Sequence, residues 1–254
     1  MSGPALHDDI DGPPRLEIDG RVATIRLARP SQHNRIDPAD IPLFCEHLDR
    51  VLSEHPDCIA VVITGTGDAT FSSGYTLQAI VDRLEESSFE TLLDAVEQCP
   101  VPTICALNGS VYGGATDLAL CCDFRVGVRG SRMFMPAARF GLHYYPGGLR
   151  RFVTAIGASE TKRLFLTAQA IDAETMLRIG YLNDLVPREE LASRVDEFIT
   201  ALARCEPGVV RTMKRQIDAI AAGDAAAATR RDDYERSLKS DELKRRVDGV
   251  TGKR

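Results

Sequence analysis

The first pattern along the chain is an alternation of apolar and polar residues over positions 15–19 and 22–27. Asp19-Gly20 separates the two stretches, and such a dipeptide between alternating runs is typical of a tight β-hairpin. Two unbroken apolar runs follow at 58–64 and 101–107. Runs of this length without alternation predict strands that are buried on both faces of a sheet.

Helical spacing begins at residues 38–54, where we expect Asp37 to be the N-cap and Pro38 the first helical residue. Polar helical patterns also lead up to Gln98. The remaining pattern predicts strands at 124–128 and 182–186 and helices at 115–122, 146–156, 159–167, 172–179, 188–204, 207–221 and 223–247. Strands that alternate with helices indicate an α/β fold with parallel pairing. We expect a loose lead-in at 1–14, a core at 15–200 and a helical subdomain at 201–254.

The net charge of the 254 residues is −6, which argues against nonspecific binding to nucleic acid or to an anionic membrane. The seven cysteines lie mostly in apolar segments and show neither a CxxC pair nor zinc spacing. We therefore expect buried, reduced thiols in a cytoplasmic protein, with no metal site. The polar start of the chain lacks the pattern of a signal peptide, and no apolar run is long enough to span a bilayer.

Two glycine-rich loops, 70–77 and 108–115, each follow one of the buried strands. Open α/β sheets bind ligands at such strand ends, and small residues allow a ligand oxygen to approach the main chain. The N–H of Gly114 also lies at the start of a predicted helix, which favours negative charge. Two N–H groups that converge on one oxygen would form an oxyanion hole, although either loop alone is more often a packing device.

These segments resemble the crotonase (enoyl-CoA hydratase/isomerase) superfamily over nearly the whole chain. The matching motifs are Arg29-Pro30-Ser31-Gln32-His33-Asn34, Phe71 to Leu77, Asn108 to Ala115, Cys122-Asp123 and Thr167 to Pro187. The resemblance implies a ClpP-like spiral of ββα units with a C-terminal helical trimerisation subdomain. It also implies a homotrimer or dimer of trimers that acts on an acyl-CoA, with coenzyme A as part of the substrate and no other cofactor.

Carried over by position, the resemblance assigns the two oxyanion donors to the backbone of Tyr75 and Gly114. It places the coenzyme A moiety along the early motif and the glycine loops, with contacts from Gln32, His33, Arg35, Ser73, Gly74, Leu77 and Gly113. Arg139, Arg150 and Arg151 are candidates for a positive patch near the phosphates, or for solvated surface.

The chain departs from the pattern of a hydratase, which carries two glutamates. Asp117 stands at the position of the first glutamate and Ala137 at that of the second. Thr76 also replaces an aspartate of the first loop. His143-Tyr144-Tyr145 occupies the loop that presents the acyl group. A hydration that uses two glutamates is therefore doubtful, because an alanine transfers no proton and an aspartate is one methylene too short.

The second glycine loop and Tyr144 resemble the methylmalonyl-CoA decarboxylase branch more closely, although Met135 replaces a polar residue of that branch. In the first hypothesis Tyr144 orients the carboxylate of a malonyl-type CoA, which loses CO2 into an enolate. In the second, a hydratase or isomerase uses Asp117, or His143 with Tyr144 or Tyr145, as its proton carrier. In the third, the chain binds acyl-CoA without catalysis.

Overall fold

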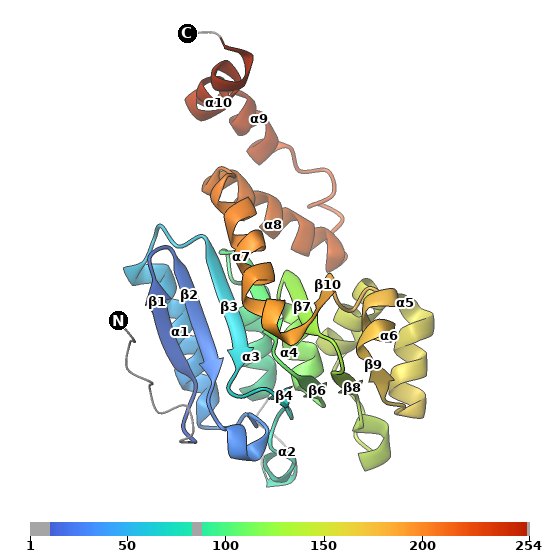
Figure 1. Cartoon of the computed structure of the whole chain (residues 1–254). Coiled ribbons are helices and arrows are strands. Elements are labelled where there is room, and N and C mark those ends of the chain that lie inside the picture. The colour runs from blue at the N-terminus through green and yellow to red at the C-terminus, as the bar shows by residue number, and fades with distance from the viewer. Residues whose placement is uncertain (1–10, 83–87, 253–254) are drawn as a thin grey trace, which may run out of the picture.

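Two β-sheets form the frame of the protein in a computed structural model that describes residues 11–82 and 88–252 (Figure 1). The larger sheet has the strand order β1-β2-β3-β5-β7-β10. Its strands are β1 (Arg15–Asp19), β2 (Val22–Leu27), β3 (Ala60–Gly65), β5 (Thr103–Leu107), β7 (Phe124–Val128) and β10 (Asp184–Val186). β1 and β2 pair antiparallel as the predicted hairpin, and the other neighbours pair parallel.

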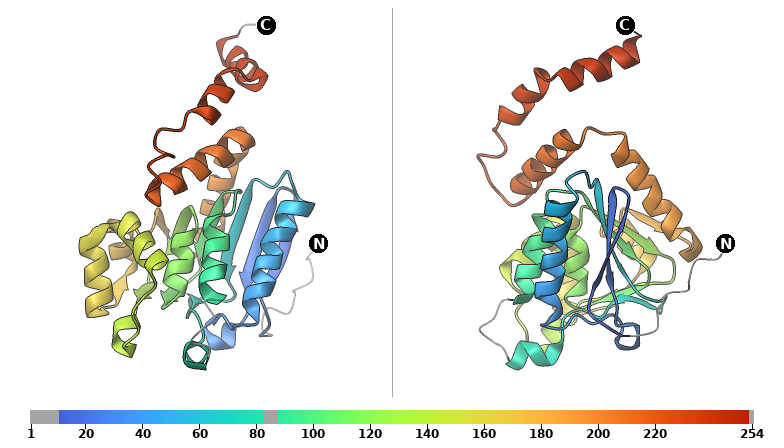
Figure 2. Two further views of the ribbon diagram at one scale, coloured as in Figure 1. Left: turned by 180° about the vertical axis from the view of Figure 1, so that it is seen from behind. Right: turned by 90° about the vertical axis from the view of Figure 1, so that its left-hand side faces the viewer.

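The central strands are buried on both faces, as the unbroken apolar runs predict. In β3, Val61 and Ile63 point into the main core, whereas Ala60 and Val62 point into a second, smaller core on the other face. Helix α7 (Leu191–Ala203) covers that second face. On the main face lie α1 (Asp40–Glu54), α3 (Ser88–Glu97) and α4 (Ala115–Cys121), so the sheet is sandwiched between helices (Figure 2).

The smaller sheet has the order β4-β6-β8-β9 and consists of strands of two or three residues. They are β4 (Thr70–Ser72), β6 (Ser110–Tyr112), β8 (Arg132–Phe134) and β9 (Ile171–Asp172). Along the chain β3 leads to β4, β5 to β6 and β7 to β8, and a helix follows each pair. This repetition is the spiral of ββα units that the resemblance implies. The helices that complete the core are α2 (Leu77–Asp82), α5 (Pro146–Thr167) and α6 (Ala173–Arg178).

The helices near residues 38–54 and 146–167 differ from the prediction. α1 begins at Asp40 with Ala39 as N-cap, because the Asp37 side chain instead pairs with Arg29 and Arg35 and does not cap. α5 joins the two predicted helices 146–156 and 159–167 across a kink at Gly157, where φ is 75°. Short 3-10 turns occupy Pro30–Gln32, Ala137–Phe140 and Arg188–Glu190.

The C-terminal part contains α8 (Pro207–Ala221), α9 (Asp232–Leu238) and α10 (Asp241–Thr251). The prediction of one helix over 223–247 was wrong. α9 begins only at Asp232 and ends at Leu238, and Ser240 then caps a new helix by accepting a hydrogen bond from the Leu243 N–H. α9 and α10 project from the core at the end opposite to α2 and the smaller sheet (Figures 1 and 2). Within the described ranges no helix is long and apolar enough to cross a membrane. Residues 1–10 of the predicted lead-in, and 83–87 of the predicted helical stretch, lie outside those ranges.

Candidate functional site

Two buried asparagines hold the first glycine loop in place. The Asn34 amide donates to the carbonyl oxygens of Thr66, at 2.9 Å, and Thr70, at 2.8 Å. Asn108 accepts from the Gly65 N–H at 3.0 Å and donates to the Gly67 carbonyl at 2.7 Å. Because each amide joins segments that are far apart in sequence, these two motif residues fix the strand ends at which a ligand would bind.

The two glycine loops meet at Gly74 and Gly114. Gly74 has φ of 87°, and a Cβ there would lie only 2.7 Å from the Gly114 nitrogen, so the loops can approach this closely only with glycine. The Gly74 carbonyl accepts from the Ile36 N–H at 2.9 Å. In a trans peptide the N–H points opposite to the carbonyl, so the Tyr75 N–H points away from Ile36. No described residue accepts a hydrogen bond from the Gly114 N–H. The convergence of both donors on one oxygen stays a prediction.

An aromatic pair that the sequence did not single out lies over this junction. The ring of Phe89, on α3, stacks on that of Tyr75 with centroids 5.0 Å apart. A Cβ at Gly114 would lie 2.6 Å from Phe89 Cε1, so the Phe89 ring contacts the start of α4. The Tyr75 side chain therefore has a packing role beside the predicted role of its backbone.

The residues predicted to contact coenzyme A lie on two segments that the structure brings together. The Ser73 N–H donates to the His33 carbonyl at 2.8 Å, and the Ser73 hydroxyl to the Gln32 carbonyl at 3.3 Å. Leu77 is exposed at the start of α2, and Gly113 donates to the Phe134 carbonyl at 2.9 Å. The Arg35 guanidinium donates to Asp37 at 2.8 Å, so a phosphate would have to compete with this ion pair.

Asp117 lies one turn into α4 and is the centre of a buried polar cluster. Its side chain is fully buried. Arg151, on α5, donates to both carboxylate oxygens, from Nε to Oδ1 at 2.9 Å and from Nη2 to Oδ2 at 3.1 Å. The Arg151 guanidinium also donates from Nη1 to Glu97 at 2.9 Å. A buried carboxylate is stable only with such a partner, and this bidentate geometry is among the strongest available.

Tyr144 and Tyr145 complete this cluster. The Tyr145 hydroxyl donates to Asp117 Oδ2, and the Tyr144 hydroxyl lies 3.1 Å from that of Tyr145 and 3.5 Å from Asp117 Oδ2. Their rings stack with centroids 4.3 Å apart. Burial raises the pKa of Tyr144 well above its ordinary value, and the charge of Asp117 adds to the rise. Burial likewise raises the pKa of Tyr145. Both phenols are therefore neutral at physiological pH.

Gly148, one turn into α5, makes room for this arrangement. A Cβ at Gly148 would overlap the Tyr144 ring and lie 2.7 Å from Asp117 Oδ2. Any side chain at this position would therefore push Tyr144 or Asp117 out of place.

The other members of the acyl-presenting loop differ in placement. His143 is exposed, with its Nδ1 2.8 Å from the Tyr144 carbonyl oxygen. Ala137 is buried at the start of a 3-10 turn, and Met135 is part of the main core. Neither of these two side chains can transfer a proton, so the predicted catalytic side chains that the structure gathers are Asp117, Tyr144 and Tyr145.

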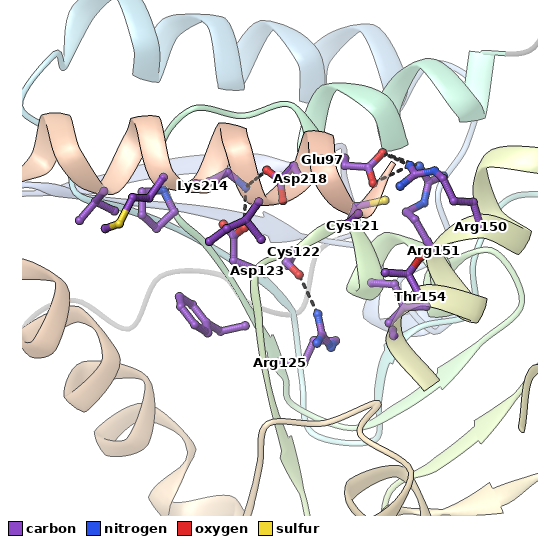
Figure 3. Close-up of a pocket in the computed structure, with 18 of the residues that line it drawn as sticks. Glu97, Cys121, Cys122, Asp123, Arg125, Arg150, Arg151, Thr154, Lys214 and Asp218 are labelled. Atoms are coloured by element: carbon purple, nitrogen blue, oxygen red, sulfur yellow. Dashed lines mark hydrogen bonds and ion pairs between the residues drawn. The ribbon is translucent and has the colours of Figure 1, made fainter. Parts of the chain in front are cut away.

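The structure does not gather the three candidate arginines into a positive patch, and one of them is not solvated surface either. Arg139 donates to the Ala168 carbonyl at 2.8 Å, Arg150 forms an ion pair with Glu97 at 2.7 Å, and Arg151 faces inward to Asp117. Figure 3 shows Arg150 and Arg151 side by side next to Glu97, in the wall of a groove of 530 Å³ under α8. Helical spacing could have identified Arg151, because it lies on the buried face of α5 with Gly148 and Phe152.

All seven cysteines are free, and five of them are buried. Burial raises the pKa of the Cys121 and Cys122 thiols well above the ordinary value, which disfavours the reactive thiolate. In the described part of the chain, no group of three or more His, Cys, Asp or Glu side chains could hold a metal ion.

Comparison with known proteins gives consistent relatives. A family model described as enoyl-CoA hydratase/isomerase matches residues 17–251. The chain is similar to the short-chain-enoyl-CoA hydratase of Clostridium acetobutylicum, with 29% identity over 80% of each chain, and to the crotonyl-CoA hydratase of Syntrophomonas wolfei, with 30% identity over 72% of each chain. The crystal structure of an enoyl-CoA hydratase from Bacillus anthracis has a TM-score of 0.85 and 25% identity, over 96% of this chain and 97% of that one.

Proposed function

Since the chain belongs to the enoyl-CoA hydratase/isomerase family and is an acyl-CoA-processing enzyme, we propose that it stabilises a thioester enolate and decarboxylates a malonyl-type acyl-CoA. The backbone N–H groups of Tyr75 and Gly114 would hold the thioester oxygen. The observation that carries this proposal is that Arg151 holds both oxygens of Asp117, while Ala137 stands where a second acid would be needed. Hydration needs both water activation and carbon protonation, whereas decarboxylation needs no base for its bond cleavage.

The reaction consumes the acyl-CoA and one proton from solvent, and it needs no other reactant. The bond between the α-carbon and the carboxylate breaks, CO2 leaves, and the electron pair flows into the thioester to give the enolate. The α-carbon then takes one proton, from the Tyr144 hydroxyl or from water, and the proton is restored from solvent. The N–H donors act most strongly on the enolate oxygen because its negative charge develops only during bond cleavage.

The surroundings of Tyr144 support its assignment as the group that orients the carboxylate. A cation beside the carboxylate would stabilise the substrate more than the transition state, in which that charge disperses. Arg151 is already engaged by Asp117 and Glu97, so the donor that the cluster would offer to a substrate carboxylate is a neutral hydroxyl. A hydroxyl can orient the breaking bond without holding its charge in place.

Hydration or double-bond isomerisation is the second candidate, since both relatives described above are named hydratases. It would require Asp117, or His143 with Tyr144 or Tyr145, to carry protons. Asp117 would then have to transfer protons while both of its oxygens accept hydrogen bonds from Arg151.

The first experiment separates these reactions by mass spectrometry of the thioester products. The purified protein is incubated separately with methylmalonyl-CoA and with crotonyl-CoA. We expect loss of CO2 from the former and no hydration of the latter. Hydration of crotonyl-CoA alone would overturn the decarboxylase proposal in favour of the second candidate. Thermal stabilisation by both thioesters without turnover would indicate a binding protein.

We also propose that the chain assembles as a homotrimer or a dimer of trimers. The support is the arm formed by α9 and α10, which projects from its own core and leaves apolar side chains exposed. These side chains are Tyr234, Leu238, Leu243, Val247 and Val250. Burial of these side chains against neighbouring chains would remove a large apolar surface from water.

A further inference from the structure

We infer that Arg151 is a positioning residue. By binding Asp117, it makes Asp117 the acceptor for the Tyr145 hydroxyl, and the Tyr144 hydroxyl is then the group of this cluster that can donate its proton to a hydrogen bond with the substrate. This inference rests on the proposed function, because it assigns a use to the Tyr144 proton. It goes beyond that function by giving a role to a residue that does not touch the acyl group.

The first hydrogen bonds of this series are those from the Arg151 guanidinium. Arg151 donates to Asp117 Oδ1 at 2.9 Å and to Oδ2 at 3.1 Å, so both carboxylate oxygens face a cation. Such a pair keeps the buried carboxylate ionised, and an ionised carboxylate can only accept hydrogen bonds. A protonated Asp117 would instead donate to one of the phenols and reverse the order.

Each phenol hydroxyl has one proton and can donate one hydrogen bond, so the partners of the Tyr144 and Tyr145 hydroxyls differ. The Tyr145 proton points to Asp117 Oδ2, where the contact is close. The Tyr144 hydroxyl is left with longer contacts, 3.1 Å to the Tyr145 oxygen and 3.5 Å to Asp117 Oδ2. The Tyr144 proton is therefore the most weakly held of the cluster, and the easiest to turn toward a ligand.

Every nitrogen of Arg151 is already engaged by a carboxylate of the protein. Its Nε and Nη2 atoms are used by Asp117, and its Nη1 atom lies 2.9 Å from Glu97 and 3.6 Å from Asp94. Burial lowers the pKa of Arg151, but its hydrogen bonds to Asp117 outweigh this, so the pKa is raised and the charge is permanent. The guanidinium is thus a fixed part of the cluster.

The groups that face Asp117 from the packed elements make it dependent on this one cation. Apart from Arg151 they are neutral or acidic: Glu90, Asp94, Glu97, Cys121, Tyr144, Tyr145 and Tyr181. Arg150 reaches the cluster only through Glu97, as Figure 3 shows. Without Arg151, a buried carboxylate among acidic neighbours would have no cation to offset the cost of its burial.

The test compares Arg151→Met, Arg151→Lys and the double variant Arg151→Met/Asp117→Asn, with Arg150→Met as the matched control. The rate of CO2 loss from methylmalonyl-CoA is measured at neutral pH. We expect Arg151→Met to lower kcat about tenfold to a hundredfold, with KM changed less than about threefold. Arg151→Lys should recover part of kcat, and Arg150→Met should behave as wild type.

The double variant separates positioning from structure, and it carries the test if Arg151→Met does not fold. It removes the unpaired buried charge, so it should recover thermal stability, but it should not recover kcat because an amide also donates to the phenols. Recovery of kcat in the double variant, or an unchanged kcat in Arg151→Met, would overturn the inference alone. Absence of turnover by the wild type would overturn the proposed function and the inference together.

Discussion

At the residue scale, the site consists of side chains that depart from the hydratase pattern and that contact one another. The sequence identified Asp117, Tyr144 and Tyr145 as unusual, and the structure brings all three into hydrogen-bond contact. The sequence did not identify the partner of Asp117. Arg150 and Arg151 are adjacent arginines, and only the face of α5 on which each lies tells them apart. Phe89 was missed because no polar or glycine signal marks it.

The Tyr144 hydroxyl gives the first prediction. Tyr144→Phe removes the donor and keeps the ring that packs against Tyr145 and Phe165, so we expect folding to be intact and turnover to fall about tenfold to a hundredfold. Steady-state rates with methylmalonyl-CoA measure this. Tyr234→Phe, on the exposed α9, is the control. Equal rates for wild type and Tyr144→Phe would remove this hydroxyl from the mechanism.

The buried tyrosines also make the free energy of unfolding depend on pH in the alkaline range. Burial raises the pKa of Tyr144, Tyr145 and Tyr181, so the folded chain keeps protons that the unfolded chain releases near pH 10. This contribution is full below about pH 10 and is lost as the pH rises further. In urea titrations from neutral to alkaline pH, Tyr181→Phe should therefore lose stability less steeply, by about 1.4 kcal/mol per pH unit. Parallel curves would contradict the assignment.

At the element scale, the length of a strand decides whether the sequence pattern predicts it. The strands of the larger sheet have long apolar or alternating runs and were predicted close to their observed bounds. The strands of the smaller sheet have two or three residues, too few for any period to emerge. Only the family resemblance implied them. The break between α9 and α10 was missed for a similar reason, because one serine cap inside a polar helical pattern carries little signal.

The anchoring of α8 gives a prediction about an element. Lys214 is buried and donates to Asp123 Oδ1 at 2.6 Å, while Asp123 Oδ2 accepts from the Thr103 N–H at 2.7 Å, so one carboxylate ties α8 to β5 (Figure 3). Lys214→Met leaves this carboxylate without its cation, and we expect unfolding to become easier by about 2–3 kcal/mol.

Arg215→Met is the matched control for this anchor, because the Arg215 side chain is largely exposed and its ion pair with Asp233 contributes about 0–1 kcal/mol. Denaturant unfolding of the two variants measures the difference. Equal losses would mean that α8 is held by its apolar contacts.

At the scale of the whole molecule, the C-terminal arm makes a prediction about assembly. Light scattering should give three or six chain masses for the full chain. A chain truncated after Gly223 lacks the exposed apolar residues of α9 and α10, and we expect it to dissociate or to associate more weakly. A monomeric full-length chain would contradict the proposed assembly.

Gly148 makes two positions of the chain depend on each other. A methyl group at 148 would overlap the Tyr144 ring and crowd Asp117 Oδ2, so the tyrosine at 144 fits this cluster only beside a glycine. Residues 144 and 148 therefore form one steric unit, in which a change at either position alters the space available to the other.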